Sequence, residues 1–512
     1  MSLTLRAAAA VAAALTIALH APAQKGAAER WPFGVEGPSQ GVGEPRLDLF
    51  NLGPLGAKCW DADRPAPSTE MTSGRRSIER HGDSGADVGP KRLVVYALFG
   101  KGPAQQAGLK LGDVVTGVGG EPFTAGCFAP LADAIRAAEA ADGKLLLDIE
   151  RDGAPQTLTL KLKKVGAAAS TPEQGKQLAT LHDDALQWLA EHQVGGGYPE
   201  TLGGTNGAVV QTCLAGLAWI SGGSSLKKGK HKANLQSAVD FVRRGLTVGD
   251  PMKGRSEANW DQTTWGQAHA AIFFGELCLV GKDKALQKEL QTIVDTLCAR
   301  QEASGGYGHG PGGKNALGYV ELNILAAYVV SGLGVAQRAG CTVDPAVVDK
   351  LLGYTRESAG DDGGVGYATG PGQKGMGNIG RTAGTWLGAR ALGRGEDPFV
   401  VRMQGYVQQH IADMMGGHAS LQQHILLGGL AAAALDAETR AAYWDGGLRR
   451  DLTLARAPDG SLQPRPWHES LSMGANTDVT MGEVWTTASW ALVLGAHRSD
   501  KKGVLSGLLG AR

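Results

Sequence analysis

The chain has 512 residues, of which 43% are hydrophobic, and its 50 basic residues equal its 50 acidic residues in number. This length allows roughly two to four domains with buried cores, and the balanced charge gives no bulk electrostatic reason to bind nucleic acid or an anionic membrane. Six scattered cysteines exclude a small fold framed by disulfides.

The N-terminus has the pattern of a secretory signal peptide. Arg6 precedes an apolar run at 7–19, and Ala21-Pro22-Ala23 places small residues where a signal peptidase cleaves. The apolar run is shorter than the roughly 20 residues of a membrane-spanning helix, and no later stretch is long and apolar enough to span a bilayer. We therefore expect a signal peptide at 1–23, a linker at 24–44 and an exported protein, periplasmic or extracellular, without a membrane span.

Residues 45–166 predict a small α/β domain. A β-branched and aromatic run at 92–99 favours a strand, and Pro and Gly bracket a short helix at 103–108. An Ala-rich helix is expected at 131–141, followed by two strands around the Asp152-Gly153 turn. The elements together predict a mixed sheet capped by two helices.

Two stretches of this domain resemble PDZ domains of the bacterial, protease-associated kind. "GLKLGDVVTGVGG" at 108–120 matches their hallmark, and "NLGPLGAKC" at 51–59 resembles their carboxylate-binding loop. The resemblance implies that the backbone amides of Leu55, Gly56 and Ala57 receive the C-terminus of a peptide or protein, since a Gly-rich turn gathers several donors. The alternative is a structural spacer.

Two features of the domain leave open whether its groove is accessible and whether two of its cysteines are bridged. An insert at 61–90 departs from the PDZ pattern and could cover the groove. Cys59 and Cys127 both lie in this domain, where they either form a bridge in an oxidising compartment or remain buried thiols.

Residues 167–500 predict an all-α domain built from repeats. Charge-bearing helices alternate with helices rich in Ala and Gly, at an interval of roughly 40 to 60 residues. The charge-poor helices begin near residues 205, 261, 315, 378, 417 and 477. Six pairs without capping repeats favour a closed (α/α)6 toroid with the charge-poor helices inside, followed by a C-terminal tail at 501–512.

The Gly-rich turns, such as "QEASGGYGHG" at 301–310, resemble the repeats of squalene cyclases and protein prenyltransferases. The resemblance implies the fold, but the Asp-x-Asp-Asp motif of the cyclases and the Asp-x-Cys zinc motif of the prenyltransferases are missing. We therefore expect no metal and no other cofactor. The order of PDZ domain and toroid resembles a family of exported bacterial proteins with no assigned activity.

Parallel inner helices would gather their N-termini, and hence polar side chains, at one mouth of the toroid. The expected ligand-binding residues there are Trp265, His269, Tyr319, Arg381, His418, His424 and Trp485. The expected catalytic residues are Glu321, Glu483, Asp261 and Asp478.

Each of these residues also has a structural interpretation. Asp261 and Asp478 are equally suited to cap helices, and His269 to be a core imidazole. Glu321 and Glu483 are expected one turn into apolar helices, where an unpaired carboxylate is costly, so they should face the central pocket or pair with Arg381.

Two functions remain open at this point. The first is a binding protein, in which the PDZ domain docks a peptide and the toroid binds a polysaccharide or peptide. The alternative is a polysaccharide hydrolase or lyase with Glu321 and Glu483 as acid and base. The sequence favours the binding protein, because it holds no complete catalytic motif.

Overall fold

A computed structural model describes a large part of the chain as two units. The described residues are 50–63, 89–167, 175–201, 203–246, 262–310, 320–370, 372–416, 420–464, 477–498, 500 and 505–510. Contacts assign residues 1–171, 175–181 and 447–486 to unit 1, and residues 172–174, 182–446 and 487–512 to unit 2. The expected signal peptide and linker lie outside the described residues, and the domain boundaries expected from the sequence stay a prediction.

Unit 1 contains an antiparallel sheet. Its strands are β1 (Phe50–Asn51), β2 (Ala57–Asp61), β3 (Leu93–Leu98), β4 (Val114–Val118), β5 (Glu121–Pro122), β6 (Lys144–Arg151) and β7 (Ala154–Lys161). The order is β1-β2-β3-β4-β6-β7, with β5 paired to β4. Every described pair is antiparallel, so the expected mixed sheet is wrong.

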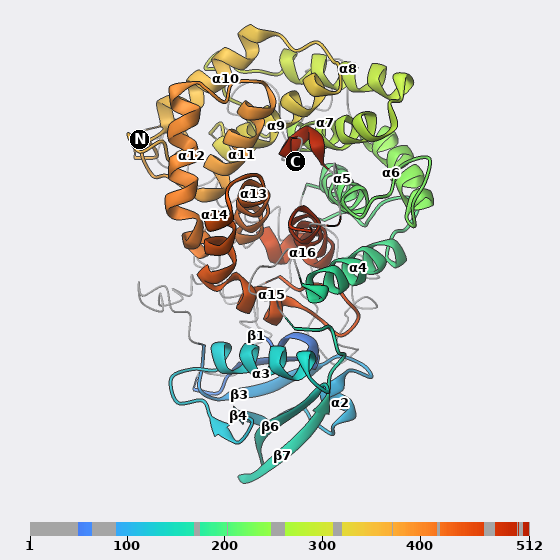
Figure 1. The fold of residues 1–512 in the computed structure, drawn as a ribbon, viewed down its shortest axis with the longest axis vertical. Helices are drawn as coiled ribbons and strands as arrows, with labels where there is room; N and C mark the ends of the chain where they lie inside the picture. The colour runs from blue at the N-terminus through green and yellow to red at the C-terminus, as the bar shows by residue number, and fades with distance from the viewer. Residues whose placement is uncertain are drawn as a thin grey trace, which may run out of the picture. The chain divides into compact units, whose positions relative to one another are not determined.

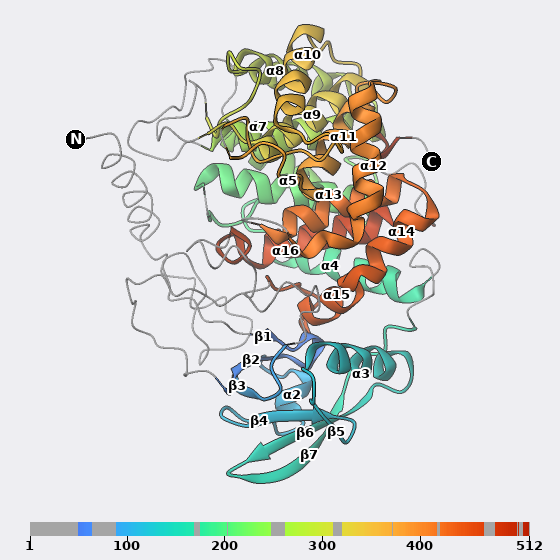
Figure 2. The same cartoon turned by 90° about the vertical axis from the view of Figure 1, so that its left-hand side faces the viewer.

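The core of unit 1 lies between the sheet and helix α3 (Phe128–Ala140), which crosses the strands in Figure 2. In β3, buried and half-buried residues alternate, as the period of a half-buried strand requires. Phe128, Leu131 and Ile135 of α3 pack on this face, and burying each contributes about 1.5 to 3 kcal/mol. A short helix, α2 (Pro103–Gln106), follows β3.

Unit 1 also includes residues from late in the chain. Helix α15 (Arg449–Ala455) belongs to it, and Leu454 is part of the same hydrophobic core as Phe128. Residues 175–181 and 477–486, which begin α4 (Lys176–Glu191) and α16 (Thr477–Ala496), are also counted with this unit. Cys59 and Cys127 are both buried, and the described structure has no disulfide between them.

Unit 2 is helical. Its elements are α5 (Thr205–Ser221), α6 (Lys232–Gly245), α7 (Thr263–Gly281), α8 (Lys284–Ala299), α9 (Asn323–Arg338), α10 (Pro345–Ser358), α11 (Ile379–Ala391), α12 (Pro398–His410), η4 (Ile411–Gly416), α13 (Leu421–Ala434), α14 (Ala437–Tyr443) and α17 (Ser506–Leu509), and η5 (Trp444–Leu448) runs from this unit into unit 1. Several helices begin where the sequence supplies a cap: Asp344 and Asp397 each accept a backbone N–H and precede a proline.

The charge-poor helices α5, α7, α9, α11 and α13 surround one centre, and the charge-bearing helices α6, α8, α10 and α12 lie outside them (Figure 1). Glycines allow the inner helices to pack closely. A Cβ on Gly388 of α11 would lie 2.5 Å from the backbone nitrogen of Ser331 in α9, so no larger residue fits without a backbone shift.

The inner helices run parallel, as expected. Near their N-terminal ends, a Cβ on Gly266 of α7 would lie 3.1 Å from Asn206 of α5. Near their C-terminal ends, a Cβ on Gly334 of α9 would lie 2.7 Å from Ala391 of α11. Gly495 of α16 packs against Ser221 of α5, so the last inner helix meets the first and the ring closes within unit 2.

Helix α17, part of the expected C-terminal tail, packs against α7, α9, α11 and α13. Glu276 of α7 accepts hydrogen bonds from the backbone N–H groups of Gly507 (3.2 Å) and Leu508 (2.8 Å). Arg338 of α9 donates to the carbonyls of Ser506 (3.1 Å) and Gly507 (3.0 Å). These bonds anchor the tail beside the C-terminal halves of the inner helices.

Candidate functional site

An aromatic and imidazole cluster lies at the N-terminal half of α7. Trp265 Nε1 donates to His309 Nδ1 (2.8 Å), and His269 Nδ1 donates to the carbonyl of Trp265 (2.9 Å). The rings of His269 and Tyr328 of α9 have centroids 4.3 Å apart. The sequence predicted Trp265 and His269 at one site, and the structure brings them together.

His269 has a buried hydrogen-bond acceptor without a partner among the described residues. Its side chain is fully buried, and burial lowers its pKa to about 4, so the imidazole is neutral near pH 7. Because Nδ1 carries the proton given to the Trp265 carbonyl, Nε2 holds a lone pair. Nε2 has no hydrogen-bond partner in the described structure, although buried polar atoms usually have one.

His309, in the Gly-rich turn at 301–310, is buried. The side chain is 7% exposed, and burial lowers its pKa to about 3. The turn is held against the inner helix because the carbonyl of His309 accepts from the N–H of Thr264 (3.1 Å) and its ring accepts from Trp265. The sequence signal that was missed is the Trp265 indole, a donor that needs a buried partner.

Arg381 is a buried cation near the N-terminus of α11. Arg381 is 6% exposed. Its Nε donates to the carbonyl of Val365 (3.1 Å), and its Nη2 donates to the carbonyl of Met376 (2.9 Å). The guanidinium lies 5.7 Å from the centre of the Tyr367 ring. Burial lowers its pKa to about 10, which leaves it charged at neutral pH. Among the described residues its hydrogen bonds go to carbonyls and to no carboxylate, so the alternative in which a glutamate pairs with it has no support there.

Glu321 lies outside the inner helix in which it was expected. Helix α9 begins at Asn323, and Glu321 is a half-buried residue before it. Its Oε2 accepts from the hydroxyl of Ser304 (2.6 Å), and its carbonyl accepts from Tyr354 (2.8 Å). A serine therefore takes the place that the sequence assigned to Arg381.

His424 lies on α13, next to the helix that carries Arg381. Its side chain is buried, and a Cβ on Gly380 of α11 would lie 3.1 Å from its ring. The first turns of α11 and α13 are thus in direct contact. Asp261, Tyr319 and His418, which were expected at the same end of the ring, lie outside the described residues.

Asp478, Glu483 and Trp485 belong to unit 1. The carboxylate of Asp478 accepts from Trp485 Nε1 (3.0 Å), and both side chains are buried. Glu483 is half-buried and follows Gly482, whose φ of 75° interrupts α16. Glu321, the other expected acid or base residue, belongs to unit 2.

The expected carboxylate-binding loop is also in unit 1. Leu55, Gly56 and Ala57 are buried, and a Cβ on Gly56 would lie 2.8 Å from the ring of Pro458. The loop therefore contacts residues of its own chain at the place where the sequence predicted a peptide terminus.

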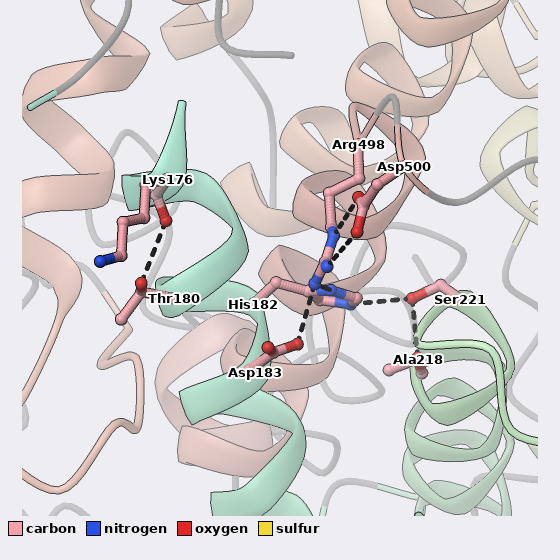
Figure 3. A network of polar contacts seen from close by, with 8 residues as sticks. All are labelled: Lys176, Thr180, His182, Asp183, Ala218, Ser221, Arg498 and Asp500. Carbon is pink, nitrogen blue, oxygen red and sulfur yellow. Dashed lines mark hydrogen bonds and ion pairs between the residues drawn. The ribbon is translucent and has the colours of Figure 1, made fainter. Parts of the chain in front are cut away.

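A serine and a histidine meet in unit 2, but not as a nucleophile and its base. His182 Nε2 lies 3.0 Å from Ser221 Oγ, and Arg498 Nη1 donates to His182 Nδ1 (3.0 Å; Figure 3). Since Nδ1 accepts, Nε2 of the neutral ring must donate to the serine, whereas a general base needs a free lone pair there. The contact instead joins α4, α5 and the residue Arg498 after α16.

Two absences apply to the part of the chain that the structure describes. No group of three or more His, Cys, Asp or Glu side chains among these residues could hold a metal ion. None of the described helices combines the length and the apolar character that a bilayer crossing needs.

Solved structures similar to the chain are distant. A glycosyl hydrolase family 88 protein from Bacteroides vulgatus is 12% identical, with 63% of this chain and 98% of that chain covered and a TM-score of 0.43. The type II terpene cyclase MstE from Scytonema is 14% identical, with 62% and 98% covered and a TM-score of 0.38. Likenesses this weak say nothing about activity.

No curated protein matches the chain. The family model described as "Domain of unknown function (DUF6288)" matches residues 232–496, which hold most of the helical ring. The chain therefore belongs to the DUF6288 family.

Proposed function

We propose that the helical ring binds a polar, anionic ligand at the N-terminal ends of its inner helices. The observation that carries this proposal is Arg381, a buried guanidinium bonded only to neutral carbonyls among the described residues. An unpaired buried charge costs several kcal/mol. A carboxylate of the ligand would remove this cost, and the nearby N-terminus of α11 favours the same charge.

The ligand class we favour is an acidic oligosaccharide. Trp265, which is half-buried, offers an aromatic face of the kind on which sugar rings stack. Nε2 of His269 is an acceptor suited to a sugar hydroxyl. An acidic peptide could pair with Arg381 equally well, but it has fewer hydroxyl groups to donate to His269 Nε2.

We propose that the protein binds its ligand without turnover. The alternative is that it cleaves a polysaccharide as a hydrolase or a lyase. A glycan hydrolase places two carboxyl groups roughly 5 to 10 Å apart. Glu321, one of the two expected carboxylates, is engaged by the hydroxyl of Ser304. We further propose, from the N-terminal sequence, that the protein acts after export, and that the sheet of unit 1 is a PDZ-like domain.

The test is a thermal-shift and calorimetric comparison of the mature protein with galacturonate oligomers and with neutral cello-oligosaccharides of equal length. We expect only the acidic series to bind, and we expect Arg381→Gln to lose this binding. Arg394→Gln is the matched control, because Arg394 is an exposed arginine of unit 2 that pairs with Asp349.

Equal binding of both series, or full retention of binding in Arg381→Gln, would refute the proposal. An acidic peptide that binds more tightly than the oligomers would replace the ligand class. Release of new reducing ends from the oligomers would support the enzymatic alternative.

A further inference from the structure

The loop before β2 contacts a later segment of the same unit, residues 453–463, which we name the docking segment. Asn51 Nδ2 donates to the carbonyls of Leu454 (2.6 Å) and Arg456 (2.9 Å). Leu454 is 2% exposed and lies in the core formed by the sheet and α3. The docking segment thus gives the sheet both hydrogen bonds and an apolar side chain.

Helix α3 holds the docking segment by a buried ion pair. Arg456 donates to both carboxylate oxygens of Glu139, at 2.9 and 2.8 Å, and the two side chains are 7% and 1% exposed. A bidentate pair of this kind is both strong and specific in direction. Breaking it would leave a buried charge without a partner.

The docking segment then turns back towards β2. The N–H of Ala457 donates to the carbonyl of Ser461 (2.8 Å), and that of Gln463 donates to Ala455 (2.6 Å). Lys58 Nζ on β2 donates to Gln463 Oε1 (3.2 Å). The loop, β2 and α3 therefore contact the same short hairpin.

Two glycines of the loop fit this approach. A Cβ on Gly53 would lie 2.5 Å from the carbonyl oxygen of Thr453, and one on Gly56 would lie 2.8 Å from Pro458. Both glycines have positive φ, at 64° and 76°, which larger residues adopt only with strain. The glycines of the predicted carboxylate-binding loop thus make room for the docking segment.

We propose that the ligand of this N-terminal domain is built into the chain. The docking segment occupies the surface that the sequence assigns to a peptide terminus, and the domain acts as a clamp on its own chain. An external peptide can enter only by displacing Leu454 and Arg456. The domain is therefore closed to free C-termini in the folded protein.

The test uses the mature full-length protein and a fluorescein-labelled peptide with the sequence of residues 449–463, RRDLTLARAPDGSLQ. We expect the parent protein not to bind it. Arg456→Glu sets like charges against each other at Glu139, so it should release the docking segment and raise the affinity for the peptide at least about tenfold. Arg136→Glu is the matched control, because Arg136 lies on α3 in a pair with the exposed Asp133.

Equal peptide binding by the parent and by Arg456→Glu would overturn the proposal, as would the absence of binding to a variant that is folded by circular dichroism. If Arg456→Glu does not fold, hydrogen exchange of the parent decides. We expect the amides of Ala457 and Gln463 to exchange as slowly as that of Val95 in β3, whose N–H donates to Asp113. Exchange at the rate of an unstructured peptide would refute the clamp.

Discussion

Replacing Glu276 by glutamine should abolish a pH dependence of the ring's stability. Glu276 is fully buried in α7, and burial raises its pKa from 4.5 to about 7, against the opposing effect of the N–H groups of Leu508 and Gly507. One pKa unit corresponds to about 1.4 kcal/mol. Ionising the carboxyl in the folded protein therefore costs about 3 kcal/mol more than ionising it in the unfolded chain.

The direction follows from proton binding. Between pH 4.5 and about 7 the folded protein holds a proton on Glu276 that the unfolded chain has lost, so the free energy of unfolding falls as the pH rises through this window. The stabilisation is complete below pH 4.5 and is lost above about pH 7. Glu276→Gln removes this titration, at a cost of about 1 kcal/mol for the weakened anchoring of α17.

The assay is urea unfolding of the parent and the variant at pH 5 and pH 8, followed by tryptophan fluorescence. We expect the pH effect in the parent to exceed that in Glu276→Gln by about 3 kcal/mol. Glu289→Gln, which alters an exposed partner of Arg243, should behave as the parent does. The same pH effect in the parent and in Glu276→Gln would show that the carboxyl of Glu276 does not titrate as argued.

Three further outcomes can be measured by unfolding. Gly388→Ala should destabilise the ring by about 1 to 3 kcal/mol, because the added methyl group meets the backbone of α9. Gly405→Ala in α12, where nothing lies within 4 Å, should instead stabilise the protein by about 0.5 to 1 kcal/mol. A loss of stability in both variants would contradict the packing argument. His182→Phe should cost about 2 kcal/mol by removing the contacts to Ser221 and Arg498, and an unchanged urea midpoint would exclude a role in ring closure. Trp265→Phe should cost about 1 to 3 kcal/mol, since it leaves His309 Nδ1 without its donor; a chemical shift of His309 that does not change would speak against that bond.

The alternation of helices could be predicted from the sequence, because it follows from local composition. Inner helices such as α5 are buried over nearly their whole length, whereas α6 buries one stripe of four residues. The spacing of charged residues in the sequence predicts this difference in burial. The turn at Asp152-Gly153 could also be predicted from the sequence, and both residues have the positive φ that a tight hairpin requires.

The pairing of distant side chains could not be predicted in the same way. Glu321 and Arg381 have the right charges for each other, but the start of α9 at Asn323 places Glu321 beside Ser304. A shift of a few residues in a helix start is beyond what composition resolves. Likewise, nothing in the sequence around Leu454 marks it as a residue of the N-terminal core.

The contact between Asn51 and Leu454 has a consequence for folding during synthesis on the ribosome. The two residues are 403 positions apart, so the strands that emerge first remain without one of their core side chains until most of the chain has been made. Domains near the N-terminus generally fold first during synthesis. Here the earliest strands must wait for the docking segment, so the first domain is completed only after most of the chain has been made.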